Sequence, residues 1–342
     1  MQHRVMTKKL RRPTISQAFL PFSRALSGSK FLMAVVVMVV VGTIGGAYLW
    51  LARANSLFPL QIAHECGGII NTHINPATGQ QYGWETYTSS LEAFNQSLAG
   101  GYYMFEVDLV LLADGGILAA HDAQESHYKG TNGQKFYQIT NRWQVTGGYD
   151  GLTLLRGQDI VNLAIQNPHI RIVLDAKKQS GAPADDRDSI VQIIAGLAKR
   201  AGHPEVLWRI VPHVRDAAST QLYRTWGYHS VILALYEDSQ YLTDAQVVQL
   251  MQQQKIPAVM MWSGTFDPSL SVKANAALHQ RYSWQFAQSL KNAGFQLYVY
   301  NNGSYPADPA HSVDSPSIVS GFMSKSVGVY SNIDHQTESY TP

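Results

Sequence analysis

The chain has 342 residues, of which 45% are hydrophobic, and this composition supplies a sizeable core and excludes a disordered protein. Residues 1–30 hold seven of the 26 Lys and Arg residues and no acid, which leaves 19 basic against 24 acidic side chains in the rest. The net charge of +2 is therefore a basic tail on an acidic domain, which argues against a nucleic acid as the main partner.

The basic tail, residues 1–30, is followed by an uncharged and almost wholly apolar run, residues 31–52. As a helix rising about 1.5 Å per residue, this run is long enough to cross a hydrocarbon core of roughly 30 Å. The basic residues before it predict that the tail stays in the cytoplasm and that the following domain is periplasmic or extracellular. We therefore predict a single-pass anchor in the cytoplasmic membrane at 31–52. A signal peptide cleaved near Ala52-Arg53-Ala54 is the alternative.

Short apolar runs alternate with amphipathic stretches in the remaining domain, residues 55–342. This alternation predicts an α/β fold, a (β/α)₈ TIM barrel preceded by one transmembrane helix. A doubly wound sheet would alternate in the same way, but no glycine-rich phosphate loop follows the first strand. The predicted strands are 60–64, 104–109, 171–175, 208–213, 231–236, 258–262, 295–300 and 328–331. The predicted helices include 90–99, 189–201, 219–226, 244–254 and 281–293, and two long loops are predicted at 71–83 and 123–155.

The second predicted strand carries two carboxylates, Glu106 and Asp108. Side chains alternate along a strand, so both carboxylates lie on one face. Two buried carboxylates side by side require positive charge, and oxygen ligands suit a hard cation such as calcium or magnesium. An edge strand with a solvated acidic face is the alternative.

The chemistry of a TIM barrel lies at the carboxyl ends of its strands. Asp175 and Lys177 repeat the i, i+2 spacing after a very apolar run, and the short strand 117–120 leads to His121 and Asp122. Carboxylates, histidines and a lysine are therefore expected to converge at one end of the barrel. The residues at the predicted strand ends are His64, Glu106, Asp108, Asp175, His213, Tyr236, Trp262, Tyr300 and Asn301.

Other residues have mainly structural interpretations. The chain has a single cysteine, Cys66, so it has no internal disulfide. A cysteine nucleophile needs a basic partner, but the neighbour of Cys66 is Glu65, so we expect Cys66 to be a small residue in a tight turn. His213 is expected to be structural. Aromatic strand residues can line a headgroup site or belong to the core, and both interpretations stay open for Tyr236, Trp262, Tyr298 and Tyr300.

Five segments carry a resemblance to a known family. They are Ile62-Ala63-His64 with Gly67-Gly68, residues 87–94, Glu106-Val107-Asp108 with Asp114-Gly115 and His121-Asp122, Leu174-Asp175-Ala176-Lys177, and residues 328–332. Over about residues 60–334 the chain resembles the glycerophosphodiester phosphodiesterases and the related barrel phospholipases of the phosphatidylinositol-specific and sphingomyelinase D kind. The Glu-x-Asp…His-Asp segment is the most specific part.

The resemblance implies one divalent cation, Mg²⁺ or Ca²⁺, bound by Glu106, Asp108 and Asp175. It further implies that His64 and His121 form an acid–base pair and that Lys177 faces the phosphate. The expected activity is hydrolysis of glycerophosphodiesters or phospholipid headgroups. Two alternatives stay open, namely a lyase that forms a cyclic phosphate and a non-catalytic barrel that binds a phosphorylated ligand or an envelope polymer. The oligomeric state is left open.

The sequence departs from the family pattern at two positions. Glu65 follows His64 where many relatives have arginine, and Asp175 stands where many have glutamate. Because adjacent residues in an extended chain face opposite sides, we expect Glu65 to point away from the site. Pairing of Glu65 with His64 and repulsion of an anionic diester are the alternatives.

Overall fold

The structure, a computed structural model, describes residues 58–67, 70–74, 81–85, 87–235, 242–262, 284–300, 321–323 and 328–331. All of them belong to the unit Ala54–Pro342. Within these ranges no helix has both the length and the apolar character that a membrane span requires. The predicted anchor at 31–52 lies outside them.

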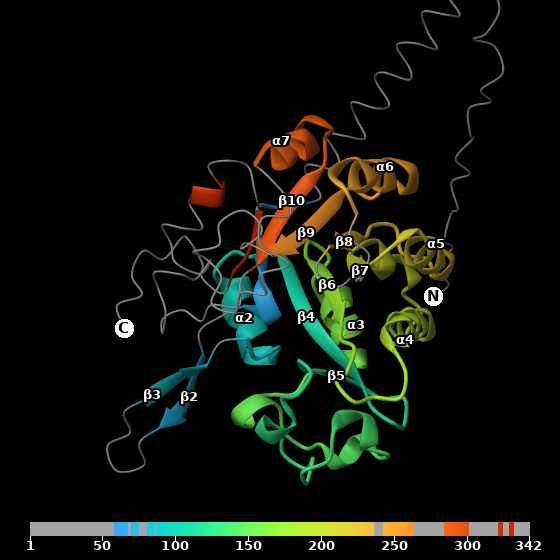
Figure 1. The fold of residues 1–342 in the computed structure, drawn as a ribbon. Helices are drawn as coiled ribbons and strands as arrows, with labels where there is room; N and C mark the ends of the chain where they lie inside the picture. Colours follow the sequence, from blue (N-terminus) through green and yellow to red (C-terminus); the bar gives the residue numbers. More distant parts are fainter. Residues whose placement is uncertain are drawn as a thin grey trace, which may run out of the picture. The chain divides into compact units, whose positions relative to one another are not determined.

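Eight parallel strands of the described chain close into a barrel (Figure 1). Their order is β1-β11-β10-β9-β8-β7-β6-β4, and the pairing of Ala63 in β1 with Phe105 in β4 closes the ring. The predicted TIM barrel is therefore confirmed. The strands are β1 (Gln61–Ala63), β4 (Met104–Leu111), β6 (Arg171–Ala176), β7 (Ile210–Val214), β8 (Ile232–Ala234), β9 (Ala258–Trp262), β10 (Gln296–Tyr300) and β11 (Gly328–Ser331).

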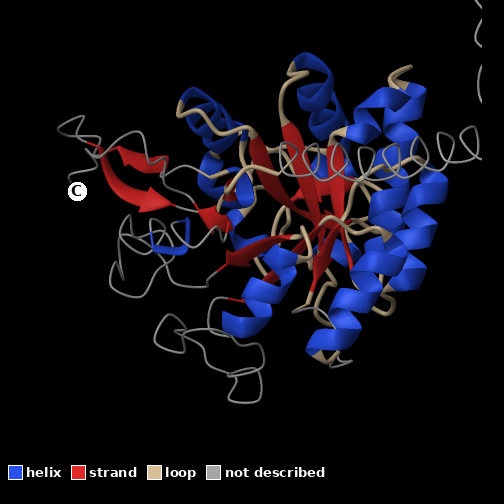
Figure 2. Cartoon of the chain, turned by 90° about the horizontal axis from the view of Figure 1, so that it is seen from above, coloured by secondary structure: helices blue, strands red, loops and turns tan. Residues whose placement is uncertain are grey.

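Helices surround the barrel, as the view in Figure 2 shows. Polar caps explain where several of them begin: the side chains of Ser90 and Asp216 accept hydrogen bonds from backbone N–H groups in the first turn of α2 and α5. Gly227 ends α5 in a left-handed conformation with φ of 109°. The helices are α2 (Leu91–Ala99), α3 (Gly157–Gln166), α4 (Arg187–Arg200), α5 (Ala217–Trp226), α6 (Asp244–Gln254) and α7 (Trp284–Asn292).

Strand alternation divides the core into two layers. In β4, Phe105 and Val107 pack outward into the layer between strands and helices. Met104 packs inward with a second cluster that fills the barrel, and Glu106 and Asp108 follow it at i+2 and i+4. The barrel interior is therefore filled with apolar side chains near the start of the strands and contains carboxylates near their carboxyl ends. We call the two ends of the barrel the strand-start face and the mouth.

β4 continues beyond the barrel into an antiparallel hairpin with β5 (Ile117–Ala119). Segment 123–155 follows, built on four single-turn 3₁₀ helices and a small apolar cluster that includes Tyr128 and Phe136. The hairpin turn holds this segment, since Asp114 Oδ2 accepts hydrogen bonds from the backbone N–H and Nε of Arg142 at 2.7 and 3.1 Å. The 3₁₀ helices are η2 (Glu125–His127), η3 (Phe136–Gln138), η4 (Arg142–Gln144) and η5 (Tyr149–Gly151).

The predicted elements agree with the described ones to within a few residues, with three differences. Helix α3 was not among the named predictions. The predicted loop 71–83 instead contains strands β2 (Ile70–Ile74) and β3 (Gln81–Glu85), which pair antiparallel. The predicted loop 123–155 holds the four 3₁₀ helices. A further single turn, η6 (Pro204–Trp208), precedes β7.

Candidate metal and active site

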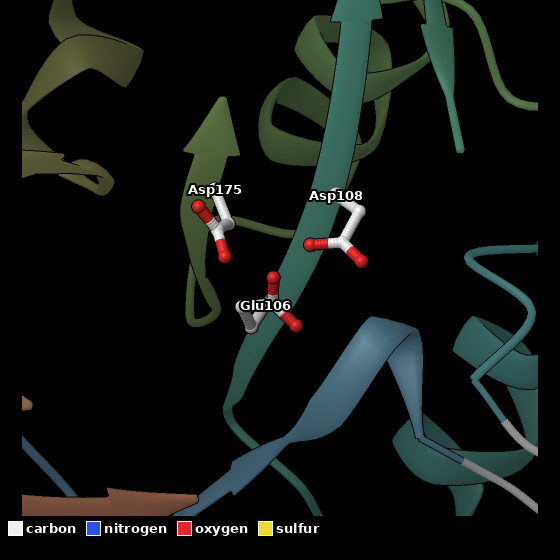
Figure 3. Close-up of side chains that lie close together, drawn as sticks. All are labelled: Glu106, Asp108 and Asp175. Carbon is white, nitrogen blue, oxygen red and sulfur yellow. The ribbon is translucent and has the colours of Figure 1, made fainter. Parts of the chain in front are cut away.

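Three buried carboxylates converge inside the mouth of the barrel (Figure 3). Glu106 and Asp108 come from β4 and Asp175 from β6, and the register of these strands pairs Asp108 directly with Asp175. Each residue offers a carboxylate oxygen, and these oxygens all lie within 4.8 Å of one another. The three residues are at most 4% exposed.

A lysine bridges two members of this acidic cluster. Lys177 directly follows β6, and its Nζ lies 2.8 Å from Asp108 Oδ1 and 2.6 Å from Asp175 Oδ2. Burial opposes the charged form of Lys177, but the two carboxylates outweigh it and raise the pKa of the ammonium well above its usual value. The lysine is therefore a fixed positive charge in the cavity.

One ammonium leaves the cluster short of positive charge. Burial, with the neighbouring charges of Asp108 and Asp175, raises the pKa of Glu106 well above the usual carboxyl value. Its Oε1 is buried and accepts no hydrogen bond from the described residues. Three converging carboxylates with such an orphaned oxygen form an all-oxygen donor set that fits a divalent cation.

His64 lies in an aromatic part of the cavity and is half-buried. It follows β1 in a short 3₁₀ turn, η1 (His64–Cys66), and the rings of Tyr87, Tyr300 and Tyr330 stand edge-on to it at centroid distances of 4.8, 6.4 and 5.9 Å. Burial lowers the pKa of His64 to about 4, against the opposing charge of Asp108. The imidazole is therefore neutral at physiological pH and can accept a proton.

His121 has the opposite character. It follows β5, and its Nδ1 lies 2.6 Å from Asp122 Oδ1, with a side chain that is 40% exposed. Desolvation opposes protonation of this imidazole, but the charge of Asp108 and the hydrogen bond to Asp122 outweigh it and raise the pKa of His121. His121 is therefore the better proton donor of the two.

Glu65 corrects an expectation. The residue is not extended, because η1 turns the chain and gives Glu65 a left-handed φ of 47°. It is 5% exposed and lines the same cavity as His64. Its backbone N–H donates to Glu106 Oε2 at 2.7 Å, and burial with the charges of Asp108 and Glu106 raises the pKa of its carboxyl. The prediction that Glu65 points away is therefore wrong, because it assumed an extended backbone.

These side chains enclose a cavity of about 400 Å³. It brings together the predicted residues His64, Glu106, His121, Asp175, Lys177 and Tyr300. Sequence reasoning missed Tyr87, Gln124, Met260 and Tyr330 as lining residues. No motif marked Gln124 or Met260, whereas Tyr87 and Tyr330 lie in the resemblance segments 87–94 and 328–332 without a role assigned to them. The lining residues are His64, Glu65, Tyr87, Glu106, His121, Gln124, Asp175, Lys177, Met260, Tyr300 and Tyr330.

The remaining residues that the sequence analysis singled out are either buried beside the cavity and in the core or lie outside the described residues. His213 is buried between Asp175 and Tyr330, with Nδ1 3.4 Å from Asp175 Oδ1 and Nε2 3.0 Å from the Tyr330 hydroxyl. Tyr298 is fully buried in the barrel and Trp262 is 7% exposed. Cys66 is buried in the η1 turn, as expected of a small turn residue. Tyr236 and Asn301 lie outside the described residues.

Comparison with known proteins supports the fold. No family model matches the sequence, and no curated protein matches it. A glycerophosphoryl diester phosphodiesterase from Parabacteroides distasonis is 15% identical with a TM-score of 0.52, over 84% of this chain and 89% of that one. A second glycerophosphodiester phosphodiesterase from this organism is 12% identical with a TM-score of 0.51, over 81% and 93%. An Oleispira antarctica phosphodiesterase, solved in complex with the product sn-glycerol-3-phosphate, is 13% identical with a TM-score of 0.50, over 83% and 96%. The chain thus has the barrel fold of glycerophosphodiester phosphodiesterases, as the resemblance implied.

Proposed function

We propose that the chain hydrolyses phosphodiesters of the glycerophosphodiester or phospholipid-headgroup class with the help of one divalent cation, Mg²⁺ or Ca²⁺. The observation that carries the proposal is the convergence of three buried carboxylates and Lys177 in a cavity that two histidines also line. The fold gives independent support, since it is similar to that of phosphodiesterases, one of which was solved with the product sn-glycerol-3-phosphate.

Positive charge is the first requirement of this chemistry, because a phosphodiester is anionic and gains negative charge on its oxygens during attack. A cation held by Glu106, Asp108 and Asp175 would supply charge to those oxygens and orient the diester. The Lys177 ammonium lies at the same cluster and adds a second positive group.

Proton transfer is the second requirement. Neutral His64 is the proposed base and takes the proton from the attacking hydroxyl, which belongs to water or to a neighbouring hydroxyl of the substrate. The new P–O bond forms as the ester P–O bond breaks, and protonated His121 gives its proton to the departing alkoxide oxygen. The opposite pKa directions of the two imidazoles support this division of roles.

Phosphorus NMR of the products tests the proposal. Incubating the protein with glycerophosphodiesters and Mg²⁺ or Ca²⁺ should convert the diester resonance into that of a phosphomonoester. A persistent five-membered cyclic phosphate resonance would identify a lyase instead. An unchanged diester with every metal and substrate tried would leave a barrel that binds phosphorylated ligands without catalysis, and would refute hydrolysis.

We also propose that residues 31–52 anchor the protein in the cytoplasmic membrane with the barrel outside the cytoplasm. The seven basic residues and the absence of acids in residues 1–30 support this orientation. A carboxyl-terminal reporter that is active only outside the cytoplasm should give a signal, whereas a signal from a cytoplasmic reporter would refute the orientation.

A further inference from the structure

Two large aromatic side chains are exposed where strands begin, at the end of the barrel opposite the mouth. Tyr103 precedes β4 and is 58% exposed, and Trp208 precedes β7 and is 59% exposed. Each lies against an exposed histidine that precedes the neighbouring strand, with ring centroids 6.3 Å apart for Tyr103 and His169 and 4.4 Å apart for Trp208 and His229. Because β4, β6, β7 and β8 are consecutive in the barrel, the four rings form a row along its rim.

Most charged residues at this end of the barrel are basic. Helices run opposite to the strands of a (β/α)₈ barrel, so helix C-termini lie beside strand starts. Glu205, which pairs with His203 at 2.9 Å, is the single acid at these positions among the described residues. The basic residues there are Arg171, Lys199, Arg200, Arg209, Arg224, Lys255 and Lys291.

The mouth is richer in acids, although Arg156, Arg187 and Arg215 lie at the starts of α3, α4 and α5. Acids occupy the first turn or the N-cap of five helices, which begin on the mouth side, and the cluster around Asp108 adds to them. The helix-start acids are Glu92, Asp159, Asp188, Asp216 and Asp244. Complementing helix dipoles accounts for part of this polarity. It does not account for the exposed Tyr103 and Trp208, because aromatic rings contribute nothing to a dipole.

The described part of the chain also begins at the strand-start face. Phe58 packs into the apolar cluster inside the barrel, and the Tyr298 hydroxyl donates to the carbonyl of Pro59 at 2.5 Å. Five residues, 53–57, separate Phe58 from the apolar run 31–52 in the sequence.

We propose that the strand-start face, defined by Tyr103, Trp208 and the seven basic residues named above, binds the surface of an anionic lipid bilayer. Tyrosine and tryptophan favour the membrane–water interface, where a ring meets acyl chains and its polar group meets water. Lysine and arginine side chains are attracted to anionic headgroups. With this face on the bilayer, the mouth opens toward the aqueous phase, so the substrate reaches the cavity from water and not from the same bilayer.

Spin labelling of the full chain in phosphatidylcholine–phosphatidylglycerol vesicles tests the proposal. A nitroxide is attached to Trp208→Cys, and the matched control is Trp143→Cys, whose parent side chain is 69% exposed in segment 123–155 on the mouth side. The native Cys66 is fully buried and does not compete for the label. Collision with oxygen reports lipid contact, and collision with a water-soluble nickel chelate reports aqueous exposure.

The label at position 208 should show severalfold more oxygen than nickel collisions, while the label at 143 shows aqueous behaviour. Equal nickel accessibility at both positions would overturn the proposal. Protection of position 208 from both reagents would also overturn it, because a protein partner or a second copy then covers the face. Combining Trp208→Cys with Lys199→Ser and Arg200→Ser should reduce lipid contact, and an unchanged value would refute recognition of the anionic surface.

Discussion

The two cavity histidines differ because His64 is surrounded by tyrosine rings and His121 is paired with a carboxylate. His64 is enclosed by tyrosine rings, and burial lowers its pKa to about 4. His121 is partly exposed, and Asp108 and Asp122 together raise its pKa despite desolvation. The environment therefore favours the neutral form of His64 and the protonated form of His121, and cleavage of an ester P–O bond requires one group of each kind.

Removing either imidazole should abolish most of the activity. We expect His64→Ala and His121→Ala each to lower kcat by about 10²–10⁴-fold, the usual contribution of general acid–base catalysis, with a melting temperature near that of the parent. Exposed His203 provides the matched control, and His203→Ala should leave kcat unchanged. Near-normal turnover in either cavity variant would return that histidine to a structural role.

The pH dependence of kcat/KM should show which histidine is the acid. His121 must be protonated, so activity is lost as pH rises through its raised pKa, and His64 must be neutral, so activity is lost as pH falls through about 4. Asp122→Asn removes a group that raises the pKa of His121, so the alkaline limb should move to lower pH while the acid limb stays. A shift of the acid limb alone would reverse the assignment.

At the scale of elements, segment 123–155 depends on close backbone contacts. Gly130 has φ of +87°, and a Cβ there would lie 1.8 Å from the Gln144 carbonyl oxygen. Gly133 has φ of +76°, and nothing lies within 4 Å of its Cβ position. Alanine at Gly133 therefore introduces backbone strain alone, whereas alanine at Gly130 introduces backbone strain and a steric clash.

We expect Gly133→Ala to cost about 1–2 kcal/mol of unfolding free energy, the left-handed penalty alone. Gly130→Ala should cost roughly 1–3 kcal/mol more, because the Gln144 backbone must move. Urea denaturation measures both, and hydrogen exchange should locate the extra loss in segment 123–155. Equal costs for the two variants would contradict the packing of this segment.

The elements that sequence predicted well are those whose pattern is local. Strand β4 has alternating side chains, so the shared face of Glu106 and Asp108 follows from a period of two. Asp175 and Lys177 follow the same rule from β6 into the next residue. The barrel itself followed from eight strand patterns in alternation with helices, since few folds satisfy that order.

Features that depend on three-dimensional context were not predictable in this way. The turn at Glu65 requires positive φ angles at three consecutive residues, Glu65, Cys66 and Gly67. Of these residue types only glycine favours a positive φ, so the sequence did not predict the turn. Tyr87 begins the resemblance segment 87–94, but nothing in that segment indicates that its ring lies beside His64. Helix α3 was not among the named predictions. The fold of segment 123–155, which precedes it, depends on the contact between Asp114 and Arg142, which are 28 residues apart in the sequence.

At the scale of the whole molecule, the two ends of the barrel differ in charge, because the strand-start face is mostly basic and the mouth is richer in acids. Acids gather at the mouth, where Glu106, Asp108 and Asp175 are buried with Lys177 as their bridging cation. Burial and the charges of Asp108 and Asp175 raise the pKa of Glu106, so its protonated form is favoured relative to an ordinary carboxyl. A divalent ion competes with protons for these carboxylates, so its affinity should rise with pH.

Isothermal titration calorimetry with Mg²⁺ and Ca²⁺ tests this account most directly. The protein should bind one divalent ion per chain, release protons on binding and melt at a higher temperature with the ion present. Asp108→Asn should abolish the binding heat, whereas the control Asp244→Asn, an exposed acid at the start of α6, should bind like the parent. Titrations without binding by either ion, or equal binding by Asp108→Asn, would contradict a metal site formed by Glu106, Asp108 and Asp175.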